Sequence, residues 1–261
     1  MKKPLLDVIF ASDKRKDALL LLQDGAKEME YLLTSLKTNR QSLLPQMRIL
    51  EDSFLVSHYE DTYELTTIGK VIVDEMVPVL DITDVLDVDV EYWGTHTLDF
   101  IPPHLLKRID ELDSCTVINP SLAEMYEVDK SFEETCRASK YVCGVTTVFH
   151  PNFTDVYTRL TNSGTIVSTV LSEDLVEKLK ANNYDEFKDL VESGKVNFYV
   201  YSRPARMIFF SLNDHCIFFS LLKVGGEFDH KNIVCHSKRA LNWGKELFEY
   251  YLRDSVPLTE I

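Results

Sequence analysis

The chain has 261 residues, of which 28 are basic and 42 acidic, so its formal net charge at pH 7 is −14. This charge excludes a protein that coats nucleic acid through a uniformly basic surface. Apolar residues make up 45% of the chain, which excludes disordered and collagen-like classes and suits one large domain or two smaller ones.

The chain lacks signals for the membrane or for secretion. No apolar run approaches the ~18 to 20 residues needed to cross a bilayer, and Met1-Lys2-Lys3-Pro4 leads into an amphipathic pattern without a cleavage site. We expect a cytoplasmic protein with no membrane partner. The cysteines have no CxxC spacing, so we expect reduced, mostly buried thiols rather than structural disulfides. They are Cys115, Cys136, Cys143, Cys216 and Cys235.

Charge divides the chain into two parts. Residues 1–80 carry 10 basic and 13 acidic side chains, whereas residues 81–261 carry 18 and 29. Between the two parts, residues 81–101 hold six acidic residues and neither Lys nor Arg. We predict a first domain over 1–80, an acidic linker over 81–101 and a second domain over 102–261.

The first domain begins with three helical patterns. Leu5, Val8 and Ile9 share one helical face, and Ser12 is placed to cap a second helix that ends at Asp24-Gly25. A third helix follows from Ala26 to Leu36. The polar break Lys37-Thr38-Asn39 separates it from a fourth helix over 40–52, which is the spacing of a helix-turn-helix.

A hairpin and one further helix complete the first domain. Residues 54–59 and 62–66 alternate as two strands around the turn Glu60-Asp61, so the order of elements predicts a winged helix-turn-helix. Thr66 is placed to cap the last helix. Its apolar residues resemble a coiled-coil seam that would pair two subunits as a homodimer: Ile68, Ile72, Met76 and Val79.

The fourth helix has the pattern of a DNA recognition helix. Leu43, Met47 and Leu50 form one inward stripe. Residues 37–50 contain three basic side chains and no acidic one, and this local positive charge suits the approach of DNA phosphates. Three basic residues alone are also typical of a helix face that is only exposed to solvent. The complete order of helices and hairpin favours the interpretation as a DNA-binding helix. The predicted DNA-binding residues are Lys37, Thr38, Asn39, Arg40, Gln41, Ser42, Gln46 and Arg48, with His58 and Tyr59 in the wing.

Two features of this region oppose DNA contact. Glu60 and Asp61 would repel the backbone, so we expect the wing to graze DNA or turn aside. Pro45 is expected to bend or shorten the recognition helix.

Six segments of the chain match the pattern of a known family: Leu5 to Lys16, Ser42-Leu-Leu-Pro-Gln46, Leu65 to Ile72, Ile101-Pro-Pro103, Phe149-His-Pro151 and Trp243 to Tyr251. They resemble the archaeal winged-helix transcriptional regulators of the methanogenesis and filament-formation type, which have an arsenical-repressor-like N-terminal domain. The resemblance covers nearly the whole chain and implies a dimeric DNA-binding regulator whose C-terminal part senses an undefined ligand.

Residues 102–261 alternate helices and strands, which predicts an α/β domain with a mostly parallel sheet. We expect strands over 115–118, 142–149, 165–171 and 196–201, with helices between them over 131–140, 153–160 and 173–192. A hairpin over 207–212 and 216–222 and a final helix over 238–252, capped by Ser237, follow.

A small-molecule effector would bind outside the carboxyl ends of the parallel strands. Four residues are placed there by the predicted strands, and Arg203 suits an anionic or polar ligand. Each of them also has a purely structural interpretation. The predicted ligand-binding residues are His150, Asn152, Ser172 and Arg203.

The sequence motifs give little support for a catalytic, metal or cofactor site. His236-Ser237-Lys238 has the start of a phospholipase-D-type motif, but Trp243 stands where the motif has aspartate, and no second copy occurs. His230, Cys235 and His236 match no recurrent metal spacing. We therefore expect no catalytic residue, no metal and no cofactor.

Other interpretations remain open. A winged helix can serve as a protein-interaction module without specific DNA binding, and the acidic charge suits that alternative. The chain could also sense redox state through a disulfide between Cys136 and Cys143, which requires their Cα atoms to lie within about 7 Å of each other.

Overall fold

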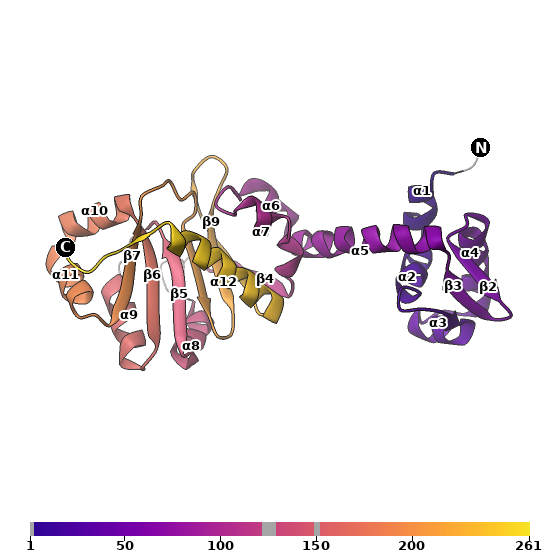
Figure 1. Cartoon of the computed structure of the whole chain (residues 1–261), viewed down its shortest axis with the longest axis horizontal. Coiled ribbons are helices and arrows are strands. Elements are labelled where there is room, and N and C mark those ends of the chain that lie inside the picture. The colour runs from indigo at the N-terminus through magenta and orange to yellow at the C-terminus, as the bar shows by residue number, and fades with distance from the viewer. Residues whose placement is uncertain (1–2, 122–128, 149–151) are drawn as a thin grey trace. The chain divides into compact units, whose positions relative to one another are not determined.

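The structure is a computed structural model that describes residues 3–121, 129–148 and 152–261. It divides into two compact units, residues 1–81 and 82–261 (Figure 1). Among the described residues, none of the helices has both the length and the apolar character needed to span a membrane.

The N-terminal unit packs helices against a small antiparallel sheet in the strand order β1-β3-β2 (Figure 1). The helix α5 runs across the division at residue 81. The helices are α1 (Leu5–Phe10), α2 (Asp13–Leu21), α3 (Met29–Ser35), α4 (Arg40–Asp52) and α5 (Thr67–Asp87), and the strands are β1 (Lys27–Glu28), β2 (Val56–Tyr59) and β3 (Thr62–Leu65).

The helix α4 has the predicted bounds and the predicted inner face. Leu43, Met47 and Leu50 are all fully buried, and the side chain of Asn39 caps the helix by accepting a hydrogen bond from the backbone N–H of Ser42 at 2.9 Å. The prediction that Pro45 shortens this helix is wrong. Pro45 lies on the exposed side in the second turn, where the missing N–H does not end the helix.

The segment after α2 differs from the prediction. Residues 27 and 28 form the strand β1, which pairs with β3 through Lys27 opposite Tyr63 and Glu28 opposite Thr62. The helix α3 therefore begins at Met29 and not at Ala26. The pairing of β1 with the distant strand β3 thus prevents residues 27 and 28 from joining the helix predicted from Ala26 to Leu36. Ser12 occupies the position before α2, but its side chain makes no capping hydrogen bond.

Gly69 allows α5 to approach the start of β2. A Cβ atom at this position would lie 2.0 Å from the carbonyl oxygen of Leu55, while Thr66 caps the helix by accepting from the N–H of Gly69 at 3.0 Å. We expect Gly69→Ala to reduce the stability of the N-terminal unit by about 1 to 3 kcal/mol, because backbone must move. Thermal unfolding followed by circular dichroism measures the change.

The matched control is Gly94→Ala, because a Cβ atom at Gly94 in α6 (Val90–Thr95) meets nothing within 4 Å. This variant should unfold at or slightly above the wild-type temperature. Equal melting temperatures for Gly69→Ala and the wild type would contradict the close approach.

The C-terminal unit contains an eight-stranded sheet in the order β11-β7-β6-β5-β8-β9-β10-β4. The pairs β5–β6 and β6–β7 are parallel, and the other five pairs are antiparallel. The prediction of a mostly parallel sheet is therefore wrong. The strands are β4 (Cys115–Ile118), β5 (Tyr141–Thr146), β6 (Ile166–Ser172), β7 (Val196–Tyr201), β8 (Phe209–Asn213), β9 (Ile217–Leu222), β10 (Phe228–Cys235) and β11 (Val256–Pro257).

Helices cover both faces of this sheet and bury a separate core on each (Figure 1). One core involves α6, α7 (Pro103–Leu106), the 3-10 helix η1 (Ile109–Glu111) and α12 (Lys238–Arg253), which Ser237 caps. The other involves α8 (Lys130–Ala138), α9 (Phe153–Asn162), α10 (Glu173–Asn182) and α11 (Tyr184–Glu192). The last two helices were expected as one.

The segment 81–101 differs from the expected linker. Tyr92, Trp93, Phe100 and Ile101 are buried in the first of these cores, and the hydroxyl of Tyr251 in α12 donates to the carbonyl of Phe100 at 2.7 Å. Residues 82–101 therefore belong to the C-terminal unit.

Candidate functional site

The outward face of α4 carries several of the residues predicted to contact DNA. Lys37, Gln41 and Arg48 are exposed, while Thr38 and Gln46 are half-buried. Lys37 adopts a positive φ of 47° in the turn between α3 and α4. The helix thus presents basic and amide groups outward and an apolar stripe inward.

Ser42 brings a basic residue that sequence reasoning missed to this face. Its hydroxyl accepts a hydrogen bond from the Nζ of Lys14 in α2. Lys14 lies 28 residues earlier in the chain, so its place beside the first turn of α4 could not be read from local spacing. Together with Asn39, whose side-chain oxygen caps the helix, this contact fixes the start of α4.

The turn of the hairpin is tied back to α4 by an ion pair. Arg40 donates to Asp61, with a distance of 2.9 Å from Nη1 to Oδ2, and these hydrogen bonds hold the pKa of Asp61 below its ordinary value. His58 Nδ1 lies 2.6 Å from Glu51 Oε1, and Tyr59 is 79% exposed. The wing therefore offers an exposed aromatic ring, and the charge of Asp61 at its turn is paired with Arg40.

The apolar seam predicted on α5 is only partly exposed. Met76 is buried in the core of the N-terminal unit and Ile72 is half-buried. Ile68 and Val79 are exposed, as is Val71. The exposed apolar residues of this helix are thus Ile68, Val71 and Val79 rather than the four predicted.

The three predicted ligand-binding residues that the structure describes have separate local contacts. His150 lies outside the described residues. Arg203 Nη1 pairs with Asp254 Oδ2 at 3.0 Å, and the hydroxyl of Ser172 caps α10 by accepting from the N–H of Leu175. Asn152 occupies the position before α9.

A cavity of about 460 Å³ lies on the sheet face that α8 and α9 cover. Its lining includes Thr146 at the carboxyl end of β5, which is the kind of edge where a ligand was expected, but Asn152, Ser172 and Arg203 are not part of the lining. The antiparallel strands β8, β9 and β10 contribute to its wall, which also holds several aromatic side chains: Phe132, Phe153, Tyr157, Phe209, Phe218 and Phe228.

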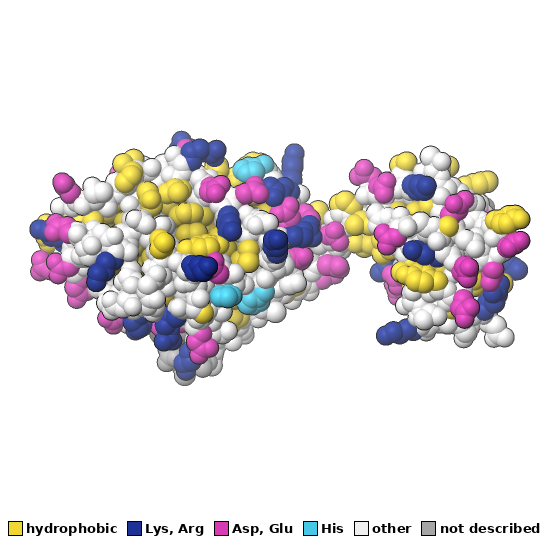
Figure 2. Space-filling model, turned by 60° about the horizontal axis from the view of Figure 1, so that its bottom comes forward, with side chains coloured by type: hydrophobic (Ala, Val, Ile, Leu, Met, Phe, Trp, Pro, Cys, Tyr) yellow, Lys and Arg dark blue, Asp and Glu magenta, His cyan; other side chains and the backbone are white. Residues whose placement is uncertain are grey.

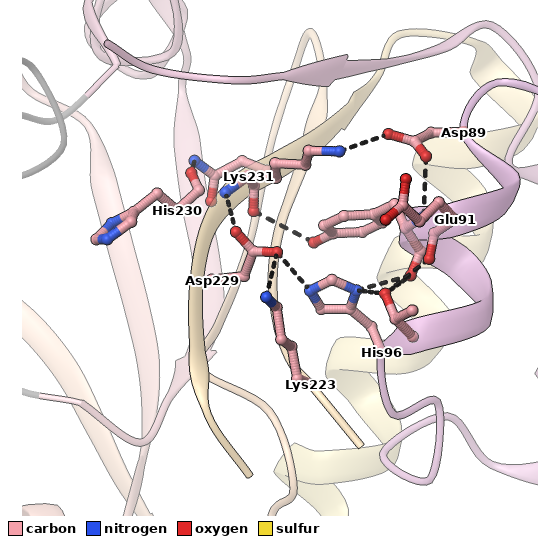
Figure 3. Close-up of polar contacts among 10 residues, drawn as sticks. Asp89, Glu91, His96, Lys223, Asp229, His230 and Lys231 are labelled. Carbon is pink, nitrogen blue, oxygen red and sulfur yellow. Dashed lines mark hydrogen bonds and ion pairs between the residues drawn. The ribbon is translucent and has the colours of Figure 1, made fainter. Parts of the chain in front are cut away.

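A second polar cluster fastens α6 to the strand β10 (Figure 3). His96 Nε2 lies 3.2 Å from Asp229 Oδ2, and its Nδ1 lies 2.7 Å from the carbonyl oxygen of Tyr92. Lys231 Nζ pairs with Asp89 Oδ2 at 3.0 Å, which raises the pKa of Lys231. His96 is buried, and its contacts with Asp229 and Tyr92 join β10 to α6.

The charge of Asp229 is maintained in this cluster despite partial burial. Burial raises its pKa, but the backbone N–H of Lys231 and the charges of Lys223 and His96 outweigh burial, so the pKa lies below its ordinary value. Lys223 Nζ is 3.7 Å from Asp229 Oδ2. Among the described residues, no group of three or more His, Cys, Asp or Glu side chains is placed to hold a metal ion.

Two of the cysteines form a disulfide, so the expectation of five reduced thiols is wrong. Cys115 and Cys235 are register partners in the antiparallel pair β4–β10, with a Cα–Cα distance of 4.0 Å and a sulfur–sulfur bond. The strand β10 was not predicted, which is why this pairing was missed. Cys136 and Cys143 belong to cores on opposite faces of the sheet, which contradicts the suggested redox pair.

The remaining thiols are protected by burial. Burial raises the pKa of Cys136 and of Cys143 to about 12 and raises that of Cys216. We expect the folded, non-reduced chain to react negligibly with an aromatic disulfide reagent at pH 8, because almost no thiolate forms. Denaturation should release three reactive thiols, and reduction before denaturation should release five. Five thiols without reduction would contradict the disulfide.

The sequence of the chain is similar to that of a family of regulatory proteins. The model of the N-terminal domain of the methanogenesis regulatory protein FilR1 matches residues 4–84, and the model of its middle domain matches residues 125–254. The curated methanogenesis regulatory protein FilR1 of Methanothrix harundinacea (strain 6Ac) is 23% identical over 258 residues. The match covers 97% of this chain, which spans 58% of the length of that relative.

Solved structures show weaker likenesses. TrmBL2, described as an archaeal chromatin protein with a novel mode of DNA binding, is 15% identical over 97% of both chains, with a TM-score of 0.44. The phospholipase D family member Nuc from Salmonella typhimurium is 9% identical over 56% of this chain and 97% of its own, with a TM-score of 0.40. The phosphatidylserine synthase of Haemophilus influenzae is 14% identical over 49% and 36%, with a TM-score of 0.36.

The two domain models of a single family, which together match most of the residues, carry the assignment. The chain therefore belongs to the family of the methanogenesis regulatory protein FilR1.

Proposed function

We propose that the chain is a sequence-specific DNA-binding transcriptional regulator that acts in the cytoplasm as a homodimer and senses a small-molecule effector with its C-terminal unit. The observation that carries the proposal is α4: a helix with a fully buried apolar stripe whose outer face offers basic and amide groups, followed directly by a hairpin. In this proposal α4 is the recognition helix of a winged helix-turn-helix and β2–β3 is the wing.

Each predicted residue has a role in this proposal. Lys37, Arg40 and Arg48 bind phosphates, and Lys14 adds a fourth positive charge beside the first turn of α4. His58 and Tyr59 of the wing contact the DNA backbone. Arg40 exchanges Asp61 for a phosphate when DNA is bound. The residues proposed to read base edges from the major groove are Thr38, Asn39, Gln41, Ser42 and Gln46.

The net charge of −14 does not oppose this role. Basic and acidic side chains are interspersed on the face of each unit that Figure 2 displays, so neither unit presents a uniformly acidic surface there. Exposed charges separated by more than about 8 to 10 Å are largely screened at ordinary salt. Local basic groups at α4 therefore decide the encounter with phosphates.

The proposed dimer uses the exposed apolar residues of α5. Ile68, Val71 and Val79 are each more than half exposed, and the exposed residues Lys70, Asp74 and Glu75 lie between them in the same helix. Two copies of such a helix bury apolar area by pairing, which would place two recognition helices for two half-sites.

Salt dependence separates DNA binding from the alternative of a protein-interaction module. Titration of the full chain into a fluorescent random-sequence duplex should show affinity falling by about 100-fold or more between 50 and 200 mM NaCl, because bound phosphates release counterions. All titrations use a buffer without Mg²⁺, so that divalent ions do not compete with the protein for the phosphates. A flat dependence on salt would favour the protein-interaction module.

A further inference from the structure

The floor of the cavity in the C-terminal unit is one row of residues that crosses five strands. Thr146 pairs with Phe209, Phe209 with Ser220, Ser220 with Asn232, and Asn232 with Ile118. Side chains in register on neighbouring strands point to the same face of a sheet. The floor beneath α8 and α9 therefore mixes polar and apolar groups, and the polar residues Ser220 and Asn232 are neighbours on it.

Two of the polar groups on this floor remain available to a ligand. The residue Ser220 is 7% exposed, and its hydroxyl makes no hydrogen bond within residues 3–121, 129–148 and 152–261. Its register partner Asn232 donates one amide N–H to the carbonyl of His230 at 3.1 Å, which leaves the amide oxygen and a second N–H.

Two other hydroxyls of the lining are already engaged. The hydroxyl of Thr146 donates to the carbonyl of Val148 at 3.1 Å, and that of Tyr157 donates to the Oγ1 of Thr169 at 3.1 Å. Ser220 and Asn232, which are register partners, thus form a small donor and acceptor pair on the floor of the cavity. Such a pair matches one hydroxyl, carbonyl or amide group of a ligand.

The walls select a flat apolar body. The rings of Phe132 and Phe218 have centroids 4.6 Å apart, and Phe209 lies 5.9 Å from Phe218. Phe228 is 52% exposed. Aromatic rings at such separations accept a further ring by stacking or edge contact.

Charge at the cavity argues against an ion as the ligand. Asp129 and Lys130 both belong to its lining and have opposite sign, and the carboxylate of Asp129 also caps α8 by accepting from the N–H of Phe132 at 2.8 Å. An ionised ligand would lose its hydration without meeting a net opposite charge.

We propose that this cavity binds an uncharged small molecule with a flat apolar body, preferably aromatic, and one hydroxyl, carbonyl or amide group that Ser220 and Asn232 hold. The volume of about 460 Å³ lies in the range of small-molecule sites. The inference rests on the proposed sensing role of the C-terminal unit and names the class of effector that this unit takes.

Direct binding of three probes to the full chain tests the inference without DNA. We expect 2-naphthol to bind with a Kd of about 0.1 to 1 mM by intrinsic fluorescence titration. Naphthalene-2-sulfonate and glucose should bind at least about tenfold more weakly, because one is ionised and the other lacks an apolar face. Equal or tighter binding of either probe, or no binding of 2-naphthol, would overturn the proposal.

Two variants locate the bound probe. Ser220→Ala should weaken 2-naphthol binding by about three- to tenfold through the lost hydrogen bond, whereas the control Ser163→Ala, at an exposed hydroxyl outside the cavity, should leave it unchanged. Val156→Trp should abolish binding by filling the cavity, with circular dichroism as the check on folding. Unchanged binding in both Ser220→Ala and Val156→Trp would overturn the site. Because no DNA is present, a failure here is distinguishable from a failure of the proposed DNA binding.

Discussion

Replacing Lys37, Arg40 and Arg48 together by alanine is expected to weaken binding of the full chain to a selected DNA duplex by about two to three orders of magnitude at 0.1 M salt. The three cations are proposed to contact phosphates from the start and the outer face of α4. Each lost contact also removes counterion release, so the slope of log K against log salt should become shallower by about 2 to 3. Fluorescence anisotropy at four salt concentrations measures both quantities.

A charge-matched control separates local contact from net charge. Lys3, Lys27 and Lys70 are exposed or half-exposed in the same unit, and their triple alanine variant changes the net charge by the same amount. It should retain most of the affinity. Because Arg40 also pairs with Asp61, Asp61→Asn tests that exposed pair alone, and it should bind DNA at least as well as the wild type. Undiminished binding by the first triple variant would remove α4 from the interface.

Replacing Cys115 and Cys235 together by serine is expected to lower the free energy of unfolding of the C-terminal unit by about 2 to 5 kcal/mol. The disulfide joins residues 120 positions apart, so its removal frees a long loop in the unfolded chain. It also loosens the edge strand β4, which pairs with β10. Thermal unfolding without reductant should show a melting temperature lower by about 5 to 15 °C.

Reductant supplies the internal control for this result. Dithiothreitol should lower the melting temperature of the wild type toward that of the double serine variant and leave the variant itself unchanged. A wild type that does not respond to complete reduction would show that the disulfide contributes nothing to stability.

The features of the N-terminal unit that could be predicted from the sequence are those set by residues close together in the chain. The bounds of α4, its inner stripe at Leu43, Met47 and Leu50, and the cap at Thr66 depend on residues within a few positions of one another. The strand β1 and the contact of Lys14 with Ser42 depend on residues 28 to 36 positions apart. No periodicity of the intervening chain contains that information.

The C-terminal unit was harder to predict because its sheet is assembled from distant strands. The strands β5, β6 and β7 were found from their apolar runs, but nothing local states that β8 pairs antiparallel with β5. The strand β10 begins Phe228-Asp-His-Lys, which reads as a polar loop, and its register shift between Phe228 and Asn232 adds to the irregularity. The disulfide and the cavity both depend on β10.

One signal of the cavity was present in the sequence. Ser220 interrupts the apolar run Ile217-Phe-Phe-Ser-Leu-Leu222 on a side that alternation assigns to the same face as Phe218. A buried hydroxyl in such a run needs a partner. The partner candidate Asn232 becomes visible only when β9 and β10 are paired in register.

In vitro selection of duplex DNA against the full chain tests sequence-specific recognition most directly. The account predicts enrichment of an imperfect palindrome with half-sites about 10 base pairs apart, or a multiple of that distance, read by two copies of α4. Substituting Gln41 or Gln46 should change the enriched bases without abolishing retention. A selection that retains DNA but enriches no motif after repeated rounds would contradict specific recognition by this chain.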